Sequence, residues 1–213
     1  LSGGISSEEC TVIIVNSTIS NNEAQGGSGD GVYVYGSTFY FLNTAIINND
    51  ENDITVADDG TDPGTAYAYY SWYGNVSGTP ILTQGTAPNE TTAYTAEDLG
   101  SLADNGGQTQ TMAVKGGSPP ATTGTLVYHN GPDGYYFVAN DSVSHELENW
   151  ATSPTVDPAD KITTDQRSAA RHDTPSMGAY EFYGDYTTNG TGTDWNTAAN
   201  WNMYNGVTTP VAT

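Results

Sequence analysis

The sequence predicts an all-β fold, a parallel β-helix in which 27-residue solenoid coils stack on one another. Two observations support this. The segment 16–22, Asn-Ser-Thr-Ile-Ser-Asn-Asn, returns at 43–49 as Asn-Thr-Ala-Ile-Ile-Asn-Asn, at an offset of 43 − 16 = 27. The offset also holds outside this match, because the apolar run 12–14 recurs as the apolar run 39–41. A fixed period of roughly 20 to 50 residues indicates stacked structural repeats.

Each 27-residue unit contains short β-rich runs separated by glycines and asparagines. This pattern is typical of strands and tight corners rather than helices. At roughly 3.3 Å per residue, one unit traces a path of about 90 Å, which suits one coil of a solenoid. A β-sandwich with similar hairpins is the alternative that the repeat leaves open.

The repeated asparagines are expected at the corners of the coils, Asn16 with Asn43 and Asn21 with Asn48. Asparagine tolerates the left-handed backbone that a corner requires, and equivalent side chains of successive coils can stack as a ladder. We therefore assign these four residues a structural role.

The chain divides into three parts by pattern. Residues 1–99 are predicted to form the coils, 100–183 an irregular C-terminal cap, and 184–213 a linker with a short trailing β segment or the start of a further module. Within the first part, 67–76 is aromatic strand material. The first coil has no evident cap, and an uncovered solenoid end is an open sheet edge that invites another chain to stack.

Composition restricts the partners. Four basic residues against 25 acidic ones give a net charge of −21, which argues against nucleic acid and anionic membranes. No apolar stretch approaches the roughly 18 residues that a spanning helix needs, so no membrane span is predicted. Abundant Gly, Thr, Asn and Tyr with almost no Lys favour an extracellular or cell-surface location.

The single cysteine, Cys10, rules out an internal disulfide. Because it precedes the apolar run 12–15, we expect it to be buried as a small hydrophobic residue. The alternative is an exposed thiol that joins chains.

Acidic loops suggest a calcium ion. Asp58, Asp59 and Asp62 offer carboxylates at short spacing, which suits a hard cation with oxygen ligands. The segment 48–53 is a second candidate. Neither loop matches the EF-hand pattern, so Ca²⁺ is the possible cofactor and no other is expected.

Four ordered blocks lie between 99 and 182: Leu-Ala-Asp-Asn-Gly-Gly-Gln-Thr-Gln-Thr at 102–111, Gly-Ser-Pro-Pro-Ala at 117–121, Asp-Gln-Arg at 165–167, and Met-Gly-Ala-Tyr-Glu-Phe at 177–182. These blocks resemble the C-terminal region of the bacterial choice-of-anchor Q domain surface proteins, and the coils also resemble the polymorphic outer-membrane protein repeats. Gln108, Ser168 and Met177 depart from the family pattern.

The resemblance implies a right-handed parallel β-helix at the bacterial cell surface, without enzymatic activity. From the residues themselves, we expect Arg167 to pair with a carboxylate and to hold the C-terminal region against the coils. The segment 194–201 is similar to a motif of large secreted adhesins.

A structural or adhesive protein is the leading functional hypothesis. Head-to-tail joining of copies, in which segment 189–213 adds a strand to the edge of the next chain, would give a filament. Its rival is a module packed against neighbouring modules of a longer surface protein. The alternative class is a carbohydrate-binding or carbohydrate-degrading β-helix, with glycans as partners. A scarcity of basic residues and the absence of a nucleophile motif argue against an enzyme.

Overall fold

The computed structural model describes residues 3–24, 31–58, 60–81, 98–115, 118–121, 123–130, 135–138, 161–172, 174–182, 186–188 and 201–203. Within these ranges the chain is all-β, with one 3₁₀ turn at Pro119–Ala121 and no α-helix. Accordingly, the part of the chain that is described contains no helix long and apolar enough to cross a membrane.

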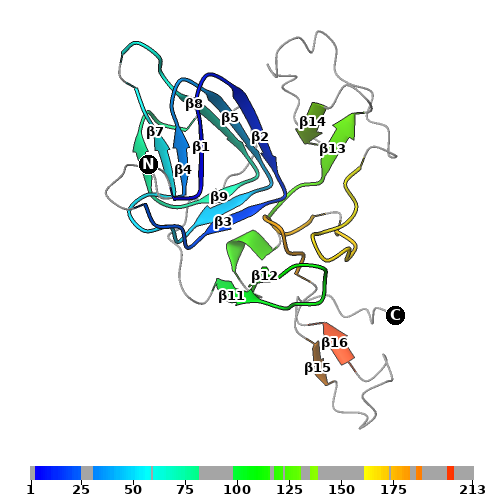
Figure 1. The fold of residues 1–213 in the computed structure, drawn as a ribbon. Coiled ribbons are helices and arrows are strands. Elements are labelled where there is room, and N and C mark those ends of the chain that lie inside the picture. The colour runs from blue at the N-terminus through cyan, green and yellow to red at the C-terminus, as the bar shows by residue number, and fades with distance from the viewer. Residues whose placement is uncertain are drawn as a thin grey trace.

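Three parallel sheets make up the N-terminal half, and they form the sides of the stack in Figure 1. The first sheet holds β1 (Ile5–Ser7), β4 (Val32–Val34), β7 (Ile54–Val56) and β10 (Val76–Gly78). The second holds β2 (Thr11–Val15), β5 (Thr38–Leu42) and β8 (Thr65–Tyr69), and the third β3 (Thr18–Ser20), β6 (Ala45–Ile47) and β9 (Trp72–Tyr73). We use "coil" for one pass of the chain through all three sheets.

The register of the second and third sheets keeps the 27-residue offset. Thr11 pairs with Thr38, and Thr38 pairs with Thr65, so the offset is the same at both steps. The predicted all-β fold with parallel stacked strands is therefore confirmed at the level of its sheets.

The first sheet departs from this offset after its first pair. Ile5 pairs with Val32, but Val32 pairs with Ile54, at an offset of only 54 − 32 = 22. The corner between β6 and β7 is five residues shorter than that between β3 and β4. The loop between β7 and β8 is five residues longer than that between β4 and β5. The two changes cancel, so β8 returns to the 27-residue register.

Inward-facing side chains fill the space between the three sheets. The core includes Phe39, Phe41, Ile46 and Val56, all fully buried. At the end formed by the first coil the core is less covered, since Ile14 and Ile19 are each 8% exposed whereas Ile46 is 0% exposed.

The C-terminal region packs on the outer faces of the second and third sheets. An antiparallel hairpin of β11 (Leu99–Ala103) and β12 (Thr111–Val114) shares an apolar cluster with Ile47 and Trp72. The pair β13 (Val127–Asn130) and β14 (Tyr135–Val138) follows, and Val127 packs against Leu42. Residues 161–182, which we call the tail, then run along the corner between the second and third sheets. The described part of the C-terminal region therefore covers these outer faces.

The trailing segment contains a two-stranded antiparallel pair, β15 (Tyr186–Thr188) and β16 (Trp201–Met203). This pair lies apart from the three parallel sheets, beyond β11 and β12 (Figure 1).

Two sequence-based expectations are wrong. Cys10 is exposed, because it lies in the bend before β2, next to Glu9 with its left-handed φ of 53°, and not in the strand itself. The aromatic run 67–76 is not one strand, because Tyr70 forms a corner with φ of 48° between β8 and β9.

Candidate functional site

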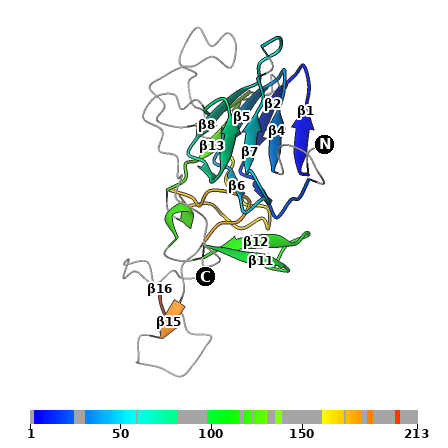
Figure 2. The same ribbon diagram turned by 90° about the vertical axis from the view of Figure 1, so that its left-hand side faces the viewer.

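The open side of the first coil is the candidate functional site. Among the described residues, β1, β2 and β3 are edge strands of their three sheets, all at the same end of the stack. Figure 2 shows β1 at the outer side of this end, near the N-terminus. We call this surface the first-coil edge.

The hydrogen bonds between coils identify the backbone groups that face outward at this edge. Thr38 donates its amide to the Cys10 carbonyl at 3.0 Å, and Ala45 donates to the Ser17 carbonyl at 2.8 Å. The equivalent amides one coil earlier belong to Thr11 and Thr18. They point to the side on which the described residues hold no further strand.

Asparagine side chains form two ladders at the corners. Asn43 Nδ2 donates to Asn16 Oδ1 at 2.8 Å, and Asn48 Nδ2 donates to Asn21 Oδ1. All four residues have left-handed backbone, with φ between 48° and 59°. Asparagine thus serves twice at these corners: its backbone adopts the left-handed conformation, and its side chain links successive coils.

The last rungs of both ladders lie at the first-coil edge. Among the described residues, the buried Asn16 Nδ2 has no hydrogen-bond partner, and neither does the buried Oγ of Ser20. Asn21 Nδ2 contacts the Met112 Sδ at 3.8 Å, and a thioether is a weak acceptor. Asn16, Ser20 and Asn21 all belong to the first coil, beyond which the described residues hold no further strand.

A hydroxyl series, which the sequence reasoning missed, runs beside the first ladder. Ser17, Thr44 and Ser71 each donate to the carbonyl two residues earlier. Extending the 27-residue offset once more, from 44 to 71, would have found it. The same step leads from Asn43 to Tyr70, so the first ladder ends there with a tyrosine.

A groove of about 880 Å³ lies along the first-coil edge, between β3, the hairpin β11–β12 and the tail. Its wall on the coil side includes Asn16, Ser20 and Asn21, and its opposite wall includes Thr111 and Met112. Two of the lining residues thus carry the unpartnered polar atoms.

The polar contacts of Arg167 lie within the tail itself. Arg167 donates from Nε and NH2 to Asp165 Oδ2, at 2.8 and 2.6 Å, and from NH2 to the Glu181 carbonyl at 2.7 Å. Its guanidinium also lies 3.7 Å from the centre of the Tyr180 ring. The arginine thus pairs with a carboxylate inside the tail, and the tail in turn contacts the coils through Ala179, whose amide donates to Thr18 Oγ1.

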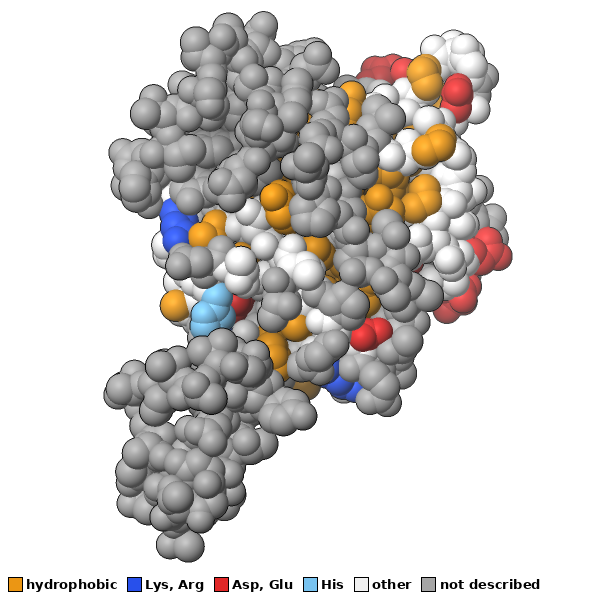
Figure 3. Space-filling model, turned by 180° about the vertical axis from the view of Figure 1, so that it is seen from behind, with side chains coloured by type: hydrophobic (Ala, Val, Ile, Leu, Met, Phe, Trp, Pro, Cys, Tyr) orange, Lys and Arg blue, Asp and Glu red, His pale blue; other side chains and the backbone are white. Residues whose placement is uncertain are grey.

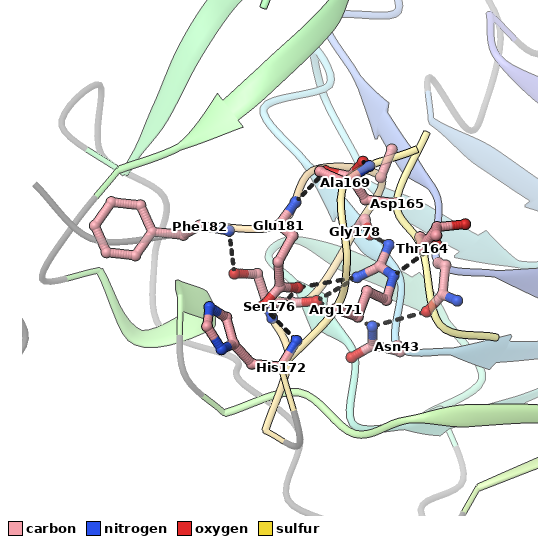
Figure 4. Close-up of polar contacts among 12 residues, drawn as sticks. Asn43, Thr164, Asp165, Ala169, Arg171, His172, Ser176, Gly178, Glu181 and Phe182 are labelled. Carbon is pink, nitrogen blue, oxygen red and sulfur yellow. Dashed lines mark hydrogen bonds and ion pairs between the residues drawn. The ribbon is translucent and has the colours of Figure 1, made fainter. Parts of the chain in front are cut away.

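A second arginine, Arg171, lies deeper. Its side chain and that of Glu181 are both 1% exposed, and NH1 lies 3.4 Å from Oε2 (Figure 4). Arg171 also donates to the carbonyls of Thr164, Ser176 and Gly178. Three carbonyls therefore hold the guanidinium independently of the carboxylate.

The two tail carboxylates have opposite pKa shifts. Burial raises the pKa of Glu181 to about 7, and the amides of Ser176 and His172 and the charge of Arg171 offset only part of it. Burial also opposes ionisation of Asp165. However, its hydrogen bonds from Glu181, Arg167 and Ala169 outweigh burial and hold its pKa below the usual value.

Two of the three predicted calcium ligands, Asp58 and Asp62, lie within the described residues. Asp58 is exposed and accepts the Gly60 amide at 2.8 Å, Asp62 lies beside Gly36, and Asp59 is outside the described residues. No group of three or more potential metal-ligating side chains occurs in the part of the chain described. Acidic side chains gather along the right-hand rim of the face in Figure 3.

The second candidate loop has a structural use. Asp53 is buried; its Oδ1 accepts from the backbone amide and side chain of Asn49, and its Oδ2 from the Asn75 amide. Burial raises its pKa despite these bonds. The carboxylate therefore accepts hydrogen bonds from donors at the short corner between β6 and β7, and in this way stabilises the corner.

Comparison of the chain with family models, with curated proteins and with solved structures gave no match.

Proposed function

We propose that this chain is a non-enzymatic structural or adhesive protein of the bacterial cell surface, built as a right-handed parallel β-helix. In this proposal it joins copies of itself, or neighbouring modules, through the first-coil edge by β-strand addition. The observation that carries the proposal is that β1, β2 and β3 are, among the described residues, edge strands of three sheets at the same end of the stack.

Backbone pairing at such an edge is sequence-independent and strong in sum. Each coil interface already contains parallel ladders in all three sheets. An open edge presents the same row of amides and carbonyls to a further chain. Strand addition therefore repeats an interface that the fold uses internally.

The buried carboxylates support a structural rather than a catalytic role. Asp53, Asp165 and Glu181 each accept hydrogen bonds from backbone amides that close corners or turns. Carboxylates engaged in this way stabilise the backbone.

The groove at the edge suits a polypeptide better than a sugar. Its described lining consists mostly of amide, hydroxyl and aliphatic side chains, and no aromatic ring is among them. A sugar ring thus finds no aromatic face on which to stack, whereas an extended backbone finds the donors and acceptors it needs.

Sedimentation velocity over a range of concentrations tests the proposal. The purified chain is expected to form species larger than its 22.4 kDa mass as concentration rises. Thr11→Pro removes an amide of the first-coil edge at the first residue of β2, a position that accepts proline, and should reduce assembly. Thr11→Ala keeps the amide and serves as the control. A chain that remains monomeric at every concentration contradicts the joining of copies and leaves only the contact with neighbouring modules.

A further inference from the structure

We infer that the occupant of the first-coil edge is the segment 200–205 of a second copy of this chain. Its Asn200 and Asn205 would be in register with Asn16 and Asn21. The inference rests on the proposed function for the existence of the joint, and it adds the identity of the segment and the side chains that select it.

The ladder shows what the edge requires. Asn43 and Asn16 have the same corner conformation, with φ of 50° and 48°. Asn16 should therefore contact an incoming strand in the way that Asn43 contacts Asn16. Asn43 Nδ2 donates to the oxygen of the rung before it, whereas Asn16 Nδ2 is buried without a partner. A buried donor without an acceptor carries its full desolvation cost until an acceptor arrives. The missing rung is therefore a side-chain oxygen.

The second ladder fixes the spacing. Asn21 follows Asn16 by five residues, and Asn48 follows Asn43 by five, with an isoleucine three residues after the first asparagine in each. Those isoleucines, Ile19 and Ile46, point into the core. An occupant thus needs asparagine, an apolar residue three positions later, and asparagine two positions after that.

This spacing of asparagines occurs three times in the whole sequence. Two occurrences are the coil corners, and the third is Asn200 with Asn205. The residue three positions after Asn200 is Met203, which takes the place of the two isoleucines. In register, Met203 would cover the end of the core where Ile14 and Ile19 are each 8% exposed.

The charge of the segment and its pairing within its own chain both allow it to move to a second copy. Residues 195–207 contain no charged side chain in a chain of net charge −21, so they can approach another copy without like-charge repulsion at the joint. Part of the segment, β16, pairs with β15 of its own chain in a two-stranded ribbon. A ribbon of two strands is marginally stable, so the exchange replaces a weak pairing with a place in a larger sheet.

The far end of a second copy does not fit this requirement. The equivalent corner of the third coil carries Tyr70 instead of asparagine. Direct stacking of one copy's last coil on another's first coil would leave Asn16 Nδ2 without an amide oxygen. The ladder therefore favours the segment over the end of the stack.

Two variants that each lack one half of the joint test this inference in the full-length chain. The edge variant is Asn16→Asp with Ser20→Ala, which keeps the oxygen that accepts from Asn43 but removes both unpartnered groups. The segment variant is Asn200→Leu with Asn205→Leu. Each variant alone should stay monomeric by sedimentation velocity, and their mixture should form a 1:1 dimer, because each supplies what the other lacks.

Matched controls separate this effect from general changes in the chain. Thr55→Val removes another buried hydroxyl without a partner, but in β7, between β4 and β10. Asn196→Leu makes the same replacement as the segment variant at an asparagine outside the pair. Both controls should associate as the unmodified chain does. If the mixture of edge and segment variants stays monomeric while the unmodified chain assembles, the inference is wrong and the proposed function stands.

A fluorescein-labelled peptide of residues 196–207 measures docking without assembly. Fluorescence anisotropy should show saturable binding to the segment variant, and the Asn16→Asp and Ser20→Ala substitutions should weaken this binding about tenfold. If the peptide binds in this way but the unmodified chain does not assemble, the docking inference is supported and the filament is contradicted. Equal affinity for the edge variant overturns the inference.

Discussion

Asn43 Nδ2 donates to Asn16 Oδ1 at 2.8 Å and to the Ser176 carbonyl at 3.0 Å, so one buried amide joins the corner ladder to the tail. Its Oδ1 also accepts the Thr125 amide at 3.1 Å. Asn43 is thus the point at which the coils and the C-terminal region share a hydrogen-bond network.

Replacing Asn43 should therefore cost more than replacing its ladder neighbour. Glycine accepts the left-handed φ of both residues, so Asn43→Gly and Asn16→Gly differ mainly in the hydrogen bonds they remove. We expect Asn43→Gly to lower the free energy of unfolding by about 2–3 kcal/mol more than Asn16→Gly, as measured by urea denaturation. Equal losses would show that the amide network at Asn43 contributes nothing specific.

The fork of Arg167 should not be replaceable by lysine. Arg167→Lys keeps the charge but loses the two-pronged contact with Asp165 and the contact with Tyr180. A loss of about 1–3 kcal/mol in the free energy of unfolding is expected. The reverse substitution at another position, Lys115→Arg, serves as a control. It should change the free energy of unfolding little. A lysine at 167 that leaves stability unaltered would show that the fork has no structural role.

Glu181 predicts a pH dependence of stability. Its pKa is about 7 in the folded chain and near 4.5 when unfolded, so between these values the folded state retains a proton that the unfolded state releases. The free energy of unfolding should therefore fall as pH rises from about 4.5 to 7, by on the order of 3 kcal/mol, and no further above pH 7.

Glu181→Gln mimics the protonated form and should remove this slope. Subtracting the variant's pH profile from that of the unmodified chain cancels the contribution of the remaining carboxylates. Asp165 has the opposite sign, because its lowered pKa gives stability that is present above pH 3.8 and lost at more acidic pH. Identical profiles for the two proteins between pH 4.5 and 7 would show that Glu181 does not titrate in that range.

The exposed Cys10 should react at once with a thiol reagent in the folded chain. One equivalent of thiol per chain is expected without denaturant, at the rate of a small free thiol within a few-fold. Reaction that appears only on unfolding would place the side chain in the core after all. The result also decides whether oxidation has to be prevented in the assembly measurements.

The parts of the fold that repeat without change could be predicted from the sequence. Asn16 and Asn43 lie at equivalent corners, and the apolar runs 12–14 and 39–41 pair residue for residue. An identical local pattern at a 27-residue offset encodes both the parallel pairing and its register, so no tertiary information is required.

The parts that the repeat does not encode could not be predicted in this way. The corner between β6 and β7 is five residues shorter, and the loop after β7 is longer by the same number. Because the two changes cancel, the 27-residue period of the sequence reveals neither of them. Tyr70 has the backbone of an asparagine corner but not its side chain, so the local pattern of the third coil predicts strand where the chain turns. The burial of Arg171 against Glu181 depends on contacts across the tail, and no local pattern marks it.

Negative-stain electron microscopy of the purified, unmodified chain tests the central claim most directly. If the first-coil edge joins copies of the chain by strand addition, the images should show ordered fibres with an axial repeat close to the length of one subunit. Thr11→Pro should reduce the number of fibres, and Thr11→Ala should retain them. Compact single particles of the unmodified chain at every concentration would contradict the claim that this edge builds a filament.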